Sequence, residues 1–155
     1  MSSTHVCVRL ARRYTARATR DEAYARSLLD GHADDASMDA PLELLELSRA
    51  VGRTVELLER QAPALADVMH VALLGYARQA TPTETYEVTW LHHGLDTAYG
   101  WPAVIAEPGV VRLADQLEAV AAVLADHAAI AEVVLMAAFY RAAAVAGQVM
   151  IVGEV

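Results

Sequence analysis

Apolar residues along this chain recur mainly at spacings of three and four, which is the period of an amphipathic α-helix. The positions between them carry charged side chains, so that one face is apolar and the other polar. No stretch alternates apolar and polar residues over a convincing length, as a half-buried strand does. The pattern therefore predicts an all-α fold, a compact helical bundle of five or six helices with a long Ala-rich C-terminal helix. The clearest apolar stripe consists of Leu44, Leu47, Val51, Val55 and Leu58.

The 155 residues are enough to bury one continuous core, and we interpret 1–155 as a single all-helical domain. Glycine and proline interrupt regular helices, so their positions suggest where one segment of this domain ends and the next begins. The expected parts are an Arg-rich N-terminal helical segment at 1–30, a polar linker at 31–40, central helices at 41–99, a connection rich in Trp, Pro and Gly at 100–109, and a long helix at 110–148.

Local signals predict some helix ends. Thr19 to Glu22 is the pattern of a capping box. Gly31 is suited to end a helix, and Pro63 to begin one. Residues 85–91 have a strand-like composition and are the stretch most at odds with an all-helical fold. The tail after residue 148 is either a fraying helix end or a short extended piece.

Composition narrows the class of protein. Hydrophobic residues make up 55% of the chain and charged residues 21%, which excludes intrinsic disorder. All 12 basic residues are arginine and alanine is abundant. Both amino acids have GC-rich codons, so a GC-rich bacterial or phage genome explains them more simply than selection for binding. A single cysteine, Cys7, excludes a disulfide framework and a cysteine-based zinc site.

Charge placement argues against export and membrane insertion. The first arginines follow a short apolar patch, whereas a secretory signal has its charges first. Charged residues also interrupt the most apolar region, 119–152, before it reaches the roughly 18 uncharged residues of a membrane span. We therefore expect a cytoplasmic protein with no membrane partner.

The basic residues are unevenly distributed. Residues 1–20 hold five arginines and no acid, whereas 21–155 hold seven arginines and 20 acids, or +5 against −13. On a helix the five would lie close to one face and could neutralise nucleic-acid phosphates. They could equally dock against the acidic remainder of the chain or a neighbouring subunit. Because an acidic body repels DNA, we favour docking on protein. The candidate residues are Arg9, Arg12, Arg13, Arg17 and Arg20.

Aromatic residues gather around the connection at 100–109. They could line a ligand pocket or form an interaction hot spot, since Trp and Tyr dominate both. They could also form a hydrophobic plug that anchors the connection, which we favour, with the last tryptophan as a buried anchor. The candidate residues are Tyr86, Trp90, His93, Tyr99 and Trp101.

Motifs for catalysis and metal binding are absent from the sequence. A di-metal site in a helical bundle needs two matching carboxylate–histidine pairs, and only Asp67 and His70 have the i,i+3 spacing. His92 and Asp96 share a helix face but supply only two ligands. No nucleophile elbow or Gly-rich phosphate loop occurs. We therefore assign no catalytic residue, no metal and no cofactor.

The leading functional hypothesis is a non-enzymatic helical interaction or assembly protein that forms a homo-oligomer, with itself or another protein as partner. One reason is the segment from Val133 to Tyr140, which is apolar on every side and which we expect to be buried on all sides. Such apolar content exceeds what a small domain readily hides, and exposed apolar surface marks interfaces. The alternatives are a nucleic-acid-associated protein that uses the Arg-rich segment, and a small-molecule or metal-binding helical bundle.

Overall fold

The protein is a mixed α/β structure, and the all-α helical bundle predicted from the sequence is wrong. The computed structural model describes residues 4–31, 43–48, 50–75, 86–90, 102–125 and 130–154. Within these ranges, five strands form one sheet in which all neighbours are antiparallel. The elements in chain order are β1 (His5–Leu10), η1 (Arg12–Tyr14, a 3-10 helix), α1 (Thr15–Arg20), α2 (Glu22–Leu29), β2 (Glu43–Leu47), α3 (Ala50–Gln61), α4 (Pro63–Leu74), β3 (Val88–Trp90), β4 (Ala103–Ile105), α5 (Glu107–Val123), α6 (Ile130–Val145) and β5 (Val149–Glu154).

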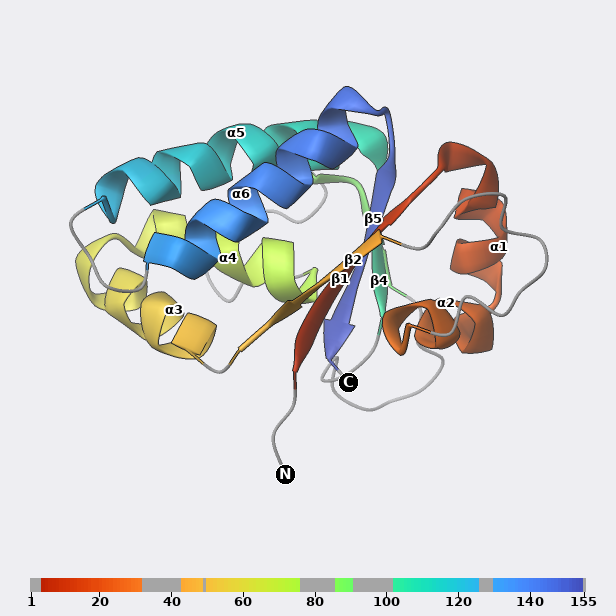
Figure 1. Ribbon diagram of the computed structural model, residues 1–155, viewed down its shortest axis with the longest axis horizontal. Helices are drawn as coiled ribbons and strands as arrows, with labels where there is room; N and C mark the ends of the chain where they lie inside the picture. Colours follow the sequence, from red (N-terminus) through yellow and green to blue (C-terminus); the bar gives the residue numbers. More distant parts are fainter. Residues whose placement is uncertain are drawn as a thin grey trace.

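Helices cover the sheet on both faces (Figure 1). The strand order is β2-β1-β5-β4-β3, so β5 from the end of the chain lies beside β1 from its beginning. Helices α1 and α2 lie on one side of the sheet, and α3 to α6 lie on the other. Each side has its own hydrophobic cluster, a smaller one with α1 and α2 and a larger one with α3 to α6. Strand β1 contributes Val6 and Val8 to the smaller cluster and Cys7 to the larger.

This double covering explains why the strands could not be recognised in the sequence. A strand that is covered on both faces needs apolar residues at every position, so the two-residue alternation disappears. Strand β5 is buried along five of its six residues, from Val149 to Gly153. A short apolar run of this kind has the same composition as a piece of buried helix.

The N-terminal segment predicted as helix begins with β1, and only short helices follow it. Helix α2 is capped by Asp21, whose side chain accepts a hydrogen bond from the Tyr24 N–H at 3.1 Å. Thr19 is not the N-cap predicted by the capping box, because it lies inside α1, where its hydroxyl donates to the Thr15 carbonyl at 2.9 Å. Gly31 follows α2 with a φ of +78°, which confirms it as a helix stop.

The stripe predicted from residue 44 to residue 58 belongs to two different elements. In β2, Leu44 packs against the smaller cluster and Leu47 belongs to the larger one, so they point to opposite faces of the sheet. The part of the stripe that is helical lies in α3, where Val51, Val55 and Leu58 are buried in the larger cluster. Helix α4 then begins at Pro63, as predicted.

The long helix predicted at 110–148 is replaced by two helices, α5 and α6. Helices α5 and α6 run antiparallel and pack side by side (Figure 1). The tail forms β5, so of the two alternatives the extended piece is confirmed. The connection predicted at 100–109 contains β4 and the first turn of α5. The strand-like composition at 85–91 corresponds to β3.

Gly109 shows why that first turn needs glycine. A Cβ atom at this position would lie 1.8 Å from the carbonyl oxygen of Tyr86. The backbone before β3 therefore packs directly against the start of α5.

In the ranges that the structure describes, no helix is long and apolar enough to cross a membrane.

Candidate functional site

The outer face of α6 carries an exposed apolar stripe. Val134 and Leu135 are 49% and 54% exposed, and Val145 is 82% exposed. The expectation that the segment Val133–Tyr140 is buried on all sides is wrong, because only its inner side faces the core. We name this surface the α6 stripe; it consists of Ala131, Val134, Leu135, Ala138, Ala142 and Val145.

The α6 stripe is continuous because its residues recur at helical spacing. From Val134 to Val145 it extends roughly 16 Å at the 1.5 Å rise of a helix. At the end of α5, Val123 is a further exposed apolar residue, with 58% of its surface accessible. No member of the stripe carries a charge or a polar side chain. The stripe is therefore an unpartnered apolar helix face within the single chain.

Arg141 borders the stripe, but its charge is matched by α5. Its guanidinium donates to Glu118 Oε1 at 2.8 Å and to Asp115 Oδ1 at 2.5 Å. These bonds raise the pKa of Arg141, and the hydrogen bond from Arg141 lowers the pKa of Glu118. The three side chains are exposed and connect the two helices beside the stripe without burying a charge.

The Arg-rich segment does not form one helical face, because its first arginine lies in a strand. Arg9 projects from β1, where its Nε donates to Gln148 Oε1 at 2.8 Å. Its Nη1 forms an ion pair with Glu43 at 3.3 Å. Arg12 lies in η1 and pairs with Glu107 at 3.2 Å. Two of the candidate arginines thus contact acidic residues of the same chain.

The other candidate arginines belong to η1 and α1. The Arg13 guanidinium lies 5.0 Å from the centre of the Tyr14 ring, and that of Arg17 lies 4.0 Å from the Tyr24 ring. Arg20 is the last residue of α1. Two of these three cations therefore stack on aromatic rings of their own segment.

The aromatic candidates fall largely outside the described residues. Tyr86 is buried, with 1% of its surface exposed, and its hydroxyl donates to Gln116 Oε1 at 2.7 Å. Trp90 is the last residue of β3, and only its backbone is described. The three remaining candidates lie outside the described residues; they are His93, Tyr99 and Trp101.

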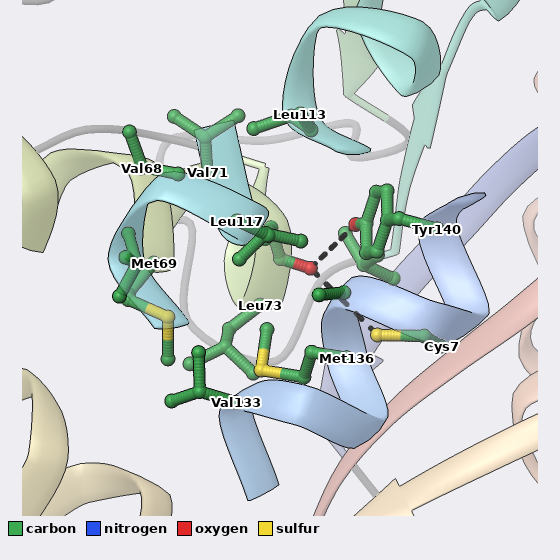
Figure 2. Packing of buried hydrophobic residues seen from close by; sticks show 14 of the residues in the cluster. Cys7, Val68, Met69, Val71, Leu73, Leu113, Leu117, Val133, Met136 and Tyr140 are labelled. Atoms are coloured by element: carbon green, nitrogen blue, oxygen red, sulfur yellow. Dashed lines mark hydrogen bonds between the residues drawn. The ribbon is translucent and has the colours of Figure 1, made fainter. Parts of the chain in front are cut away.

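Cys7 is not a nucleophile in this fold. Its thiol is fully buried in the larger cluster, and burial raises its pKa to about 12. The thiol donates to the Ala72 carbonyl at 3.7 Å, and the Tyr140 hydroxyl donates to the same oxygen at 2.7 Å (Figure 2). Both side chains therefore donate hydrogen bonds to the C-terminal end of α4, where the last carbonyl groups of a helix lack partners within it.

A second candidate site is a cavity that sequence reasoning missed. It has a volume of about 260 Å³ and lies between the ends of β1 and β5 and the facing sides of α3 and α4. His5 and Glu154 are register partners on neighbouring strands, with Nδ1 and Oε1 3.8 Å apart. On the helical wall, His70 Nε2 lies 3.0 Å from Glu59 Oε1. We call this the His–Glu pocket.

No sequence signal pointed to the His–Glu pocket, because its pairs are distant along the chain. The spacing of Asp67 and His70 suggested a pair within one helix, but His70 contacts Glu59 across the interface between α3 and α4. His5 and Glu154 come from opposite ends of the chain and meet only through strand pairing. Within the described ranges, no three His, Cys, Asp or Glu side chains are grouped closely enough to hold a metal ion.

The electrostatics of the pocket favour neutral His5. Burial lowers the pKa of His5, and the nearby His70 lowers it further, whereas Glu154 raises it to a smaller extent than burial lowers it. A third carboxylate, that of Glu56, also lines the cavity. The described part of the pocket wall is therefore rich in hydrogen-bond acceptors.

Known proteins offer no guide to the function of this chain, which leaves the α6 stripe and the His–Glu pocket as its candidate sites. No family model, no curated protein and no solved structure matches the chain. The fold defines a mixed α/β protein with one antiparallel sheet, an exposed apolar helix face and an acidic pocket on the same side of the sheet.

Proposed function

We propose that this protein is a non-enzymatic assembly protein that self-associates through the α6 stripe. The observation that carries the proposal is the exposure of Val134, Leu135 and Val145 on one uncharged helix face. Exposed apolar residues that gather into a patch mark interaction surfaces, whereas isolated ones are ordinary. A second copy of the chain is the occupant that the chemistry of the stripe favours.

The energetics support a symmetric contact. Complete burial of a Val or Leu side chain contributes about 1.5–3 kcal/mol relative to full exposure. The stripe offers three such side chains that are 49% to 82% exposed. In a two-fold interface each residue is used twice, so the gain is doubled. The stripe suits such pairing because it has no charge to repel its own copy, although the whole chain carries −8.

Alanine makes close contact between two copies possible. Ala131, Ala138 and Ala142 separate the larger side chains of the stripe. Small side chains allow two helix backbones to approach, while the larger residues of one copy fill the spaces of the other. Two crossing α6 helices are therefore the expected geometry of the dimer.

Sedimentation velocity of the full chain over micromolar concentrations tests the proposal. We expect a mass of about twice 16.7 kDa or more for the wild type. Val134→Glu and Val145→Glu each place a carboxylate in the contact and should weaken association at least about tenfold, equivalent to about 1.4 kcal/mol. Ala23→Glu is the matched control, since it adds the same charge at an exposed position of α2 on the other side of the sheet.

Two outcomes would contradict self-association through this surface. One is a wild-type mass of 16.7 kDa at every concentration. The other is an oligomer that the two stripe variants weaken no more than Ala23→Glu does. Circular dichroism of each variant verifies that the fold is retained.

We also propose that the Arg-rich segment acts within the protein rather than on nucleic acid. The ion pairs of Arg9 with Glu43 and of Arg12 with Glu107 support this proposal. Gel retardation of DNA or RNA at near-physiological salt, lost in Arg12→Ala, would overturn it.

We further propose that the protein works in the cytoplasm. A single cysteine that is buried as a free thiol supports this location. Export of the protein to an oxidising compartment would overturn this proposal.

A further inference from the structure

The His–Glu pocket is a cavity lined by polar side chains and lies apart from the α6 stripe. Its strand wall carries His5 and Glu154, and its helical wall carries Glu59 and His70. None of its described lining residues belongs to α6. The pocket therefore calls for an explanation independent of the α6 stripe.

The charged residues that line the pocket determine whether it suits a cationic or an anionic ligand. Among the described residues, three carboxylates line the cavity, from Glu56, Glu59 and Glu154, and no arginine does. An anion would meet uncompensated negative charge, whereas a cation with N–H groups would meet carboxylate acceptors. The buried Nδ1 of His5 makes no hydrogen bond, and its 3.8 Å separation from Glu154 Oε1 is too long for one.

The arrangement of the acceptors decides the shape of the ligand. They belong to two walls, and within the described ranges no three of them are grouped closely enough to hold a metal ion. A ligand with one N–H end at the pair His5–Glu154 and another at the pair His70–Glu59 would use the acceptors of both walls. We propose that the His–Glu pocket binds a small organic cation with N–H donors at both ends, of the class of the short aliphatic diamines.

Size is compatible with this class. A volume of about 260 Å³ corresponds to roughly nine water molecules at about 30 Å³ each. A diamine with a chain of four carbons has six non-hydrogen atoms and fits in this space. Val55 and Leu73 line the same cavity and can contact the methylene groups between the two charged ends.

Calorimetric titration of the full chain with diaminobutane tests the proposal. We expect saturable binding of one ligand per chain, and none of butanediol, which has a similar shape but no charge. Glu154→Gln and Glu59→Gln should each weaken binding at least about tenfold, because each removes a charged acceptor from one wall. Glu46→Gln is the matched control, since Glu46 is an exposed residue of β2 one position from the register partner of His5.

A second measurement uses only the wild-type protein and therefore does not require any variant to fold. Addition of diaminobutane to the wild type should shift the side-chain NMR signals of His5 and His70 along one saturable curve. Three results would overturn the proposal: no binding, equal weakening by Glu46→Gln, or binding of butanediol as tight as that of the diamine. Tight binding of zinc ions that diaminobutane does not displace would overturn it as well, in favour of a metal site.

Discussion

Tyr140→Phe removes a single oxygen atom from the larger hydrophobic cluster and should destabilise the fold. The Tyr140 side chain is fully buried, and its hydroxyl donates to the Ala72 carbonyl at 2.7 Å. Ala72 is the third residue from the end of α4, so its carbonyl is among the last four, which lack partners within the helix. The substitution keeps the ring and its packing, and therefore isolates the hydrogen bond.

The structure sets the size of the effect. A buried acceptor that loses its partner costs about 1–3 kcal/mol. The Cys7 thiol remains near the same oxygen at 3.7 Å, but a thiol is a weak donor and compensates only in part. We therefore expect a loss of about 1–2 kcal/mol in the free energy of unfolding. For a chain of this size that corresponds to a fall of roughly 2–8 °C in Tm.

Urea unfolding followed by circular dichroism measures this loss. Tyr86→Phe is the comparison, because its hydroxyl donates to the side chain of Gln116, which is partly exposed and can turn to water. It should cost less than about 1 kcal/mol. In a double-mutant cycle, Cys7→Ala should cost more in the Tyr140→Phe background, where no side-chain donor to Ala72 is left. An unchanged midpoint for Tyr140→Phe, or strict additivity in the cycle, would refute the reasoning.

Three further predictions follow from the same structure. Gly109→Ala should destabilise the fold by about 1–3 kcal/mol or more in urea unfolding, because the new Cβ would lie 1.8 Å from the Tyr86 carbonyl oxygen; a variant as stable as the wild type would contradict this packing. The Cys7 thiol should resist alkylation in the native protein at about pH 8 and react once the chain is unfolded, since burial raises its pKa to about 12; rapid labelling of the native protein would contradict its burial. Because burial lowers the pKa of His5, the unfolded chain takes up the proton first, and stability should fall as the pH drops below the unfolded value of 6.5 towards the lower folded value. Urea unfolding at several pH values should show a shallower fall for His5→Gln than for the wild type, and parallel profiles would contradict the shift.

Local patterns in the sequence determined several helical features correctly. The apolar spacing from Val51 to Leu58 is the buried face of α3. Pro63 begins α4, and Gly31 ends the α2 segment with a positive φ. These features depend on residues within one or two turns of each other, since a helix forms its hydrogen bonds within its own segment. A sequence read by itself contains that information.

The sheet was decided only by the tertiary structure. Strands β1 and β5 lie at opposite ends of the chain and pair with each other. Helices on both faces removed the alternation that identifies a strand, so the tail that forms β5 could be interpreted equally as a helix end or as an extended piece. Leu44 and Leu47, three residues apart in β2, face opposite sides of the sheet because side chains alternate along a strand, and both sides are apolar because helices cover both.

The candidate sites divide in the same way. The uncharged run from Val133 to Tyr140 was evident in the sequence, but only the packing of α6 against one layer left Val134 and Leu135 exposed. His5 joins Glu154 only because β1 pairs with β5. Burial and contacts between distant segments arise when the chain closes on itself. The sequence thus determined which residues are apolar, charged or helix-breaking, while the tertiary structure decided which of them meet and which remain at the surface.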